Sequence, residues 1–86
     1  MRILDAQKHE IAEKVYSKLI YFYNNKIPVH FVVAQGYFQN GTIIDLNEEK
    51  FSLVIKEFKD GAMPHLLEDI NPDSIVEYNN PNKEKQ

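Results

Sequence analysis

The feature that most constrains this chain is a run of strand-forming residues interrupted by two glycines. It extends from Lys26 to Lys56 and reads KIPVHFVVAQGYFQNGTIIDLNEEKFSLVIK. Valine, isoleucine, phenylalanine and tyrosine dominate the run, and these residues are enriched in strands. Gly36 predicts a tight connection or bulge between two strands. Gly41 falls inside the second strand, where glycine commonly marks a sharp bend or a close backbone approach. The run therefore predicts a small, strongly bent antiparallel barrel.

A helix is predicted before the strands, at residues 5–24. Its apolar residues recur at helical spacing. They include Leu4, Ile11, Val15, Leu19 and Phe22. Asp5 is the predicted N-cap, because its carboxylate can accept from the free N–H groups of the first turn. Asn24 and Asn25 can take the left-handed conformation that ends a helix, and Pro28 prevents continuation.

Five short strands are predicted after the helix, so the fold class is mostly β with an N-terminal α-helix. The predicted strands are Val29–Gln35, Tyr37–Asp45, Phe51–Phe58, His65–Ile70 and Ser74–Tyr78. Polar turns separate the later strands, and Asp60-Gly61 is a strong hairpin signal. One domain at residues 1–78 is expected. Residues 79–86 are polar and contain a proline, which predicts a disordered tail.

Composition limits how such a domain can be stabilised. A chain of 86 residues buries only about 60% of its unfolded surface. The absence of cysteine excludes disulfides and thiolate metal sites, which leaves oligomerisation. No apolar run approaches the ~20 residues of a membrane span, and the N-terminus lacks the apolar segment of a signal peptide, so a cytoplasmic location is expected. The formal net charge of −3 argues against strong non-specific binding to phosphate.

Catalytic patterns are missing from the sequence. His9, His30 and His65 are too dispersed to form a recognisable metal-ligand motif. No nucleophile elbow and no glycine-rich phosphate loop occurs. The pair Glu68-Asp69 is interpreted as a solvated strand face. The chain is therefore predicted not to be an enzyme, with no metal, no cofactor and no small-molecule substrate.

The segment from Lys26 to Ile43 resembles the Sm-like (Sm/LSm/Hfq-like) family. Lys26-Ile27-Pro28-Val29 is similar to the family's entry into its first strand. Gly36 and Gly41 match its two glycines, and Ile43 matches the apolar residue that follows. The resemblance implies an Sm-like, SH3-like barrel that self-associates through strand edges into a homo-oligomeric ring. It also implies binding of single-stranded RNA, as an RNA chaperone or a scaffold for RNA processing.

Five residues are the candidate RNA contacts under this resemblance: Lys26, Tyr37, Gln39, Asn47 and Lys50. Lys26 is the cation left where the Hfq-like proteins have a basic rim. Tyr37 can stack on a base, and Gln39 can read a base edge with its amide. Asn47 and Lys50 lie in the loop after the second strand. The family usually has an aspartate where this chain has Asn47. The alternatives are that Tyr37 is a core or interface residue and that Asn47 and Lys50 form a solvated turn.

Two further readings remain open, because several RNA-contacting positions of the family carry other residues here. The acidic pair Glu68-Asp69 stands where Hfq-like proteins have a Tyr-Lys-His run. One alternative is an Sm-like protein-interaction module without RNA binding, and another is a monomeric SH3-like barrel. RNA binding predicts an affinity that falls steeply with salt and with substitution of Lys26, Lys50 or Tyr37. A protein module predicts no salt slope and sensitivity at exposed helix aromatics such as Tyr21.

Overall fold

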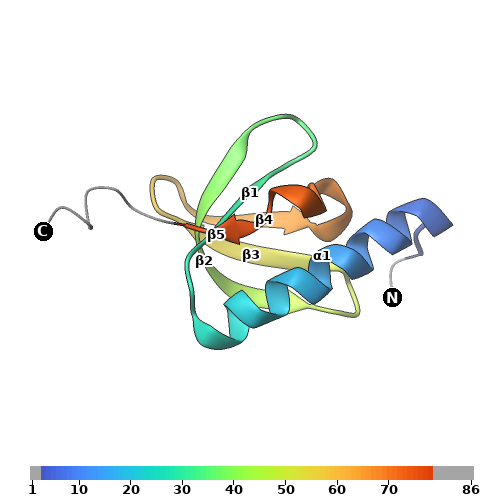
Figure 1. Cartoon of the computed structure of the whole chain (residues 1–86), viewed down its shortest axis with the longest axis horizontal. Helices are drawn as coiled ribbons and strands as arrows, with labels where there is room; N and C mark the ends of the chain where they lie inside the picture. Colours follow the sequence, from blue (N-terminus) through green and yellow to red (C-terminus); the bar gives the residue numbers. More distant parts are fainter. Residues whose placement is uncertain (1–2, 79–86) are drawn as a thin grey trace, which may run out of the picture.

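Residues 3–78 are described by the computed structural model, which consists of one helix followed by a five-stranded antiparallel sheet (Figure 1). The elements are α1 (Ala6–Asn25), β1 (Val29–Val32), β2 (Phe38–Asn47), β3 (Ser52–Glu57), β4 (Gly61–Leu66), the 3₁₀ helices η1 (Leu67–Asp69) and η2 (Pro72–Ser74), and β5 (Val76–Glu77). The predicted tail at 79–86 lies outside the described residues. A mostly β fold with an N-terminal helix is confirmed.

Helix α1 begins at the predicted cap. The Asp5 carboxylate accepts a 2.9 Å hydrogen bond from the Lys8 backbone N–H. The helix ends at Asn25, one residue later than expected. The left-handed residue that ends it is Lys26, with a φ of 54°, and not Asn24 or Asn25. The Ile27 N–H donates to the Phe22 carbonyl at 3.0 Å, which satisfies one of the last free acceptors of the helix. The chain then passes directly into β1.

The strands lie in the order β4-β3-β2-β1-β5, and every neighbouring pair is antiparallel. Strands β4 and β5 are therefore the two edges, and the described residues form no pairing between them. The sheet curls strongly. The rings of Phe58, just after β3, and Tyr78, just after β5, lie 5.2 Å apart although β2 and β1 separate these strands in the sheet.

Gly41 lies where β2 is flanked on both sides, opposite Val29 on β1 and Glu57 on β3. A Cβ atom at this position would collide with the Lys56 carbonyl oxygen and would lie 2.9 Å from the Glu57 Cα. Only glycine permits this close backbone approach. Gly41 is thus a point of close backbone approach between β2 and β3. A register shift between Ile43 and Asp45 follows in the same strand.

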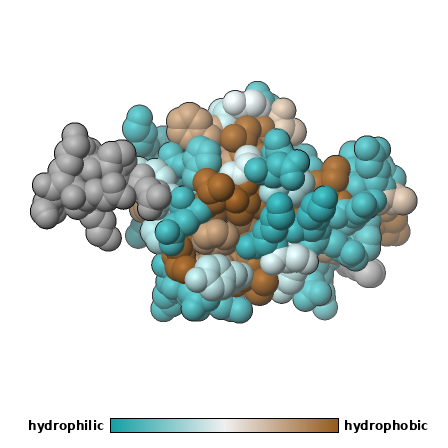
Figure 2. All heavy atoms as spheres, in the orientation of Figure 1, coloured by the Kyte–Doolittle hydropathy of each residue, from teal (hydrophilic) through white to brown (hydrophobic). Residues whose placement is uncertain are grey.

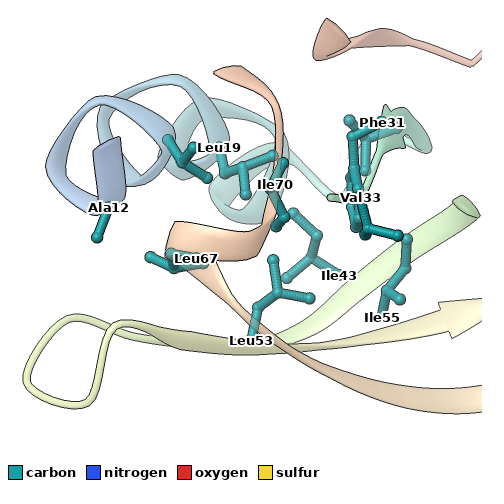
Figure 3. Close-up of a cluster of buried hydrophobic side chains, with 11 residues drawn as sticks. Ala12, Leu19, Phe31, Val33, Ile43, Leu53, Ile55, Leu67 and Ile70 are labelled. Atoms are coloured by element: carbon teal, nitrogen blue, oxygen red, sulfur yellow. The ribbon is translucent and has the colours of Figure 1, made fainter. Parts of the chain in front are cut away.

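The core lies between α1 and the inner face of the curled sheet. Figure 3 shows side chains from α1, η1 and strands β1, β2 and β3 converging on one cluster. Eleven apolar residues of the described chain are fully or almost fully buried: Ala12, Val15, Leu19, Val29, Phe31, Val33, Ile43, Leu53, Ile55, Leu67 and Ile70. The stripe of α1 that contributes Ala12, Val15 and Leu19 follows the predicted helical spacing.

The fourth strand was predicted at His65–Ile70, and this position is wrong. Gly61 takes a φ of 78°, so the turn ends there and β4 begins at once, at Gly61–Leu66. The chain then folds into η1, where the Ile70 N–H donates to the Leu67 carbonyl at 3.1 Å. Burial of both Leu67 and Ile70 favours this compact turn over an extended strand. Residues 68 and 69 therefore do not lie on a strand face.

Other strand boundaries also differ from the prediction. Strand β1 ends at Val32, and Val33 forms only an isolated bridge to Ile70. Phe51 has a φ of 47° and belongs to the turn before β3. Strand β5 is only two residues long. The segment before it forms η2, because the Ser74 hydroxyl donates to the Asn71 carbonyl at 2.7 Å and accepts from the Val32 N–H at 2.8 Å.

Candidate functional site

A hollow of about 430 Å³ opens between the β1–β2 turn and strand β4. We call it the β4 hollow. Its lining consists of Gln35, Tyr37, Ser52, Met63, Pro64, His65, Leu66 and Asp69. These residues come from the β1–β2 turn, β3, β4 and η1. The lining combines the Tyr37 ring and the apolar side chains of Met63, Pro64 and Leu66 with a few polar groups, as small-molecule sites commonly do.

Tyr37 is presented to solvent by the tight β1–β2 turn. Gly36 takes a φ of 94°, and its N–H donates to the Val33 carbonyl at 2.8 Å. The Val33 N–H in turn donates to the Tyr37 carbonyl at 2.9 Å. The Tyr37 side chain remains 48% exposed. A ring held by backbone hydrogen bonds and open to water is a suitable surface for stacking.

His65 forms the inner wall of the β4 hollow. Its ring meets the buried Phe31 ring edge to face, with centroids 5.8 Å apart. Its Nε2 atom is buried and has no hydrogen-bond partner among the described residues. Burial lowers the pKa of His65, and the negative charge of Asp69 opposes this shift to a smaller extent. His65 is therefore uncharged at neutral pH.

A second exposed aromatic lies on the outer face of the sheet. Phe38 is 59% exposed, and its ring lies 5.6 Å from the His30 ring. The His30 Nδ1 atom lies 2.6 Å from the Asn40 Oδ1 atom, within hydrogen-bonding distance. Both Tyr37 and Phe38 are thus exposed, because Tyr37 precedes the strand and escapes its alternation of faces.

The other predicted RNA contacts lie elsewhere. Gln39 is only 4% exposed, and its amide nitrogen donates to the Phe38 carbonyl at 3.2 Å, so it is not available on the surface. The Asn47 side chain accepts from the Lys50 N–H at 2.9 Å within the β2–β3 turn. Lys26 lines a separate hollow at the end of α1. Of the five residues, only Tyr37 lines the β4 hollow.

Comparison with known proteins adds no assignment: no family model matches the chain, and neither the curated proteins nor the solved structures include a significant match.

Sequence reasoning missed several residues of the β4 hollow, above all Gln35, His65 and Asp69. Asp69 was interpreted as part of a solvated strand face. The structure places it in η1, half-buried, beside the β1–β2 turn. The one available signal was the apolar pair Leu67 and Ile70, whose spacing also fits a single 3₁₀ turn.

The described residues give no sign of a metal centre or of a membrane helix. In residues 3–78, no three histidine or acidic side chains gather closely enough to hold a metal ion. No helix of the same residues has both the length and the apolar character needed to cross a bilayer. In Figure 2, hydrophobic atoms show through among hydrophilic ones over the strands in the middle of the molecule. Exposed apolar side chains on the two edge strands are Leu66 and Val76.

Proposed function

We propose that this chain is an Sm-like small barrel that binds single-stranded RNA, with a base held in the β4 hollow. The observation that carries the proposal is the exposed Tyr37 ring beside a hollow large enough for a nucleobase and lined by polar groups. Stacking of a base on an aromatic side chain contributes about 1–3 kcal/mol. Amide, hydroxyl and carboxylate groups around that ring can then bind the base edge.

The charge of the chain limits how the RNA is held. A formal net charge of −3 provides little general attraction for phosphates. Affinity must come mainly from stacking and base-edge contacts at Tyr37. Lys26 and Lys50 lie on other parts of the surface, at the end of α1 and in the β2–β3 turn, and would contribute at most a few phosphate contacts.

Assembly into a homo-oligomeric ring is part of the proposal. Strands β4 and β5 are the two free edges, and an unpaired edge is stabilised by pairing with another chain. Head-to-tail pairing of β4 with the β5 strand of the next subunit would give a ring if the repeated rotation returns to the first subunit, and an open filament if it does not. Exposed Leu66 on β4 and Val76 on β5 would be covered by such pairing. The contact between the rings of Phe58 and Tyr78 supports a barrel-like curl.

The cytoplasm is the proposed setting, because the proposed function requires access to cellular RNA. The role would be that of an RNA chaperone or a scaffold for RNA processing.

A titration of a fluorescently labelled single-stranded RNA, followed by fluorescence anisotropy at several salt concentrations, tests the proposal. We expect saturable binding with a shallow salt dependence, because few phosphates are neutralised. Size-exclusion chromatography with light scattering tests the ring and should give a closed oligomer. Absence of RNA binding would overturn the proposed function, and a clean monomer would overturn the ring.

A protein-interaction module is the second candidate. The negative net charge favours it, as does Tyr21, which is 59% exposed on the outer side of α1. Large exposed aromatics are enriched at protein interfaces. Under this alternative the chain binds no RNA, and substitution of Tyr21 weakens capture of its partner.

A further inference from the structure

We propose that the β4 hollow selects guanine among the four RNA bases through the carboxylate of Asp69. This inference rests on the proposed function, since it names the base that the hollow would bind. It arises from the position of Asp69 beside the turn that carries Gln35 and Tyr37.

Asp69 is held in place by its backbone. Its carbonyl oxygen accepts a 2.6 Å hydrogen bond from the Ala34 N–H, next to Gln35 in the β1–β2 turn. The half-buried side chain lines the β4 hollow. Within residues 3–78 the structure shows no hydrogen bond to the Asp69 carboxylate, so its oxygens can accept from a ligand. An ionised carboxylate accepts only, and it can receive two parallel N–H groups.

Guanine is the base that matches two adjacent acceptors. Its N1–H and N2–H₂ groups lie side by side on the Watson–Crick edge. Adenine and cytosine each present one amino group beside a ring nitrogen that accepts, and uracil presents one N–H between two carbonyl oxygens. In each of these three bases, an acceptor would face the carboxylate and repel it. Mismatched bases are therefore strongly disfavoured, because polar groups that lose their hydrogen-bond partners on binding cost free energy.

Two neighbours complete the match to guanine. The Gln35 amide can donate to O6, which lies next to N1–H on the same edge of the base. The Tyr37 ring supplies stacking, which every base can use and which therefore does not select among them. Selection then depends on Asp69. His65, the titratable group of β4 that lines the same hollow, has a pKa lowered by burial and carries no positive charge at neutral pH.

A guanidinium group from a peptide would present similar paired N–H donors. The volume of about 430 Å³ favours a base with its ribose, since pockets of this size enclose whole small ligands. An arginine-containing peptide is the competing occupant, and the test distinguishes it from RNA.

The test uses three RNAs that differ at one central position in an otherwise identical adenine-rich strand: guanine, inosine or adenine. Inosine keeps N1–H and O6 and lacks only the 2-amino group. We expect the wild-type protein to bind the guanine strand about 5- to 150-fold more tightly than the inosine strand, the range for one bidentate base contact. Binding of the adenine strand should be at least as weak as that of the inosine strand.

Asp69→Asn should abolish the preference for guanine over inosine and should bind the adenine strand at least as tightly as the wild type, because an amide does not repel the ring nitrogen of adenine. Asp73→Asn is the matched control. Asp73 is exposed in η2, so this substitution removes the same charge at a position away from the hollow. It should keep the preference. The comparison of the three RNAs on the wild-type protein tests guanine selection even without a variant.

Equal binding of all three strands by the wild-type protein, or a guanine preference that survives in Asp69→Asn, would overturn guanine selection while leaving RNA binding intact. If no strand binds, the proposed function and this inference both fail. Binding of an arginine-rich peptide that is lost in Asp69→Asn, without RNA binding, would assign the hollow to a peptide partner.

Discussion

The backbone N–H of Ala34 donates a 2.6 Å hydrogen bond to the backbone oxygen of Asp69, and this contact joins the β1–β2 turn to η1. Two neighbouring contacts reinforce the junction. Val33 forms an isolated bridge to Ile70, and the Asn71 N–H donates to the Val32 carbonyl at 2.9 Å. Backbone groups therefore hold the walls of the β4 hollow. Side-chain substitutions in the hollow consequently test its chemistry more than its fold.

Gly41→Val is expected to destabilise the fold severely, by more than about 3 kcal/mol. Its Cβ would collide with the Lys56 carbonyl oxygen, and β3 could not remain paired at that point. Urea denaturation of the variant and the wild type measures the difference. Gly36→Ala is the matched control, because a Cβ there meets no atom within 4 Å and only the positive φ is unfavourable. Near-wild-type stability of Gly41→Val would contradict the described register of β2.

Glu57→Gln is expected to reduce stability at neutral pH and to remove part of its pH dependence. Burial alone raises the pKa of Glu57, but backbone N–H groups of Lys59, Asp60 and Asn40 donate to its carboxylate and lower the pKa below the ordinary 4.5. The stabilisation is therefore present above the ordinary pKa and is lost as the pH falls through the lowered one. Urea midpoints at neutral and acidic pH should show the two proteins converging in acid. A constant gap would exclude this role.

His65→Leu is expected to make the fold less sensitive to mild acid. Burial lowers the pKa of His65 below its ordinary 6.5, so the unfolded chain binds a proton before the folded protein does. Stability of the wild type should therefore fall as the pH drops below that ordinary value. Thermal melts across the mildly acidic range measure the slope. A slope in His65→Leu as steep as in the wild type would show that another group titrates.

Leu19→Ala is expected to cost about 2–5 kcal/mol, because it opens a cavity between α1 and the sheet. Leu19 is fully buried in the core cluster. Lys14→Ala, on the exposed side of α1, should change stability by no more than about 0.5 kcal/mol. The two free energies of unfolding come from urea titrations. Equal effects would mean that the apolar stripe of α1 does not cover the sheet.

The local parts of the fold could be predicted from the sequence. Helical periodicity and the Asp5 cap define α1, because both depend on residues close in the chain. The same holds for Gly41, whose place inside a strand indicates a close backbone approach. The fourth strand was misplaced because Leu67 and Ile70 fit either an extended segment or a 3₁₀ turn, and burial against α1 decides between them.

The site was less predictable than the fold. Tyr37 was found because an aromatic beside a turn glycine is visible in the sequence. Asp69 reaches the same place only through the backbone contact with Ala34, which no local pattern indicates. Gln39 was expected to contact a base edge, but the alternation of side chains along β2 places it on the buried face of the sheet. Which face a strand residue occupies depends on the exact register, and sequence patterns define the register least well.

Equilibrium RNA binding by Tyr37→Ala, measured beside Tyr21→Ala, tests the central claim most directly. Both tyrosines are exposed, and neither substitution changes the net charge. We predict that Tyr37→Ala weakens binding of a single-stranded RNA about 5- to 150-fold, the loss of one stacked base, while Tyr21→Ala binds like the wild type. Equal binding by Tyr37→Ala and the wild type would contradict a base site at the β4 hollow.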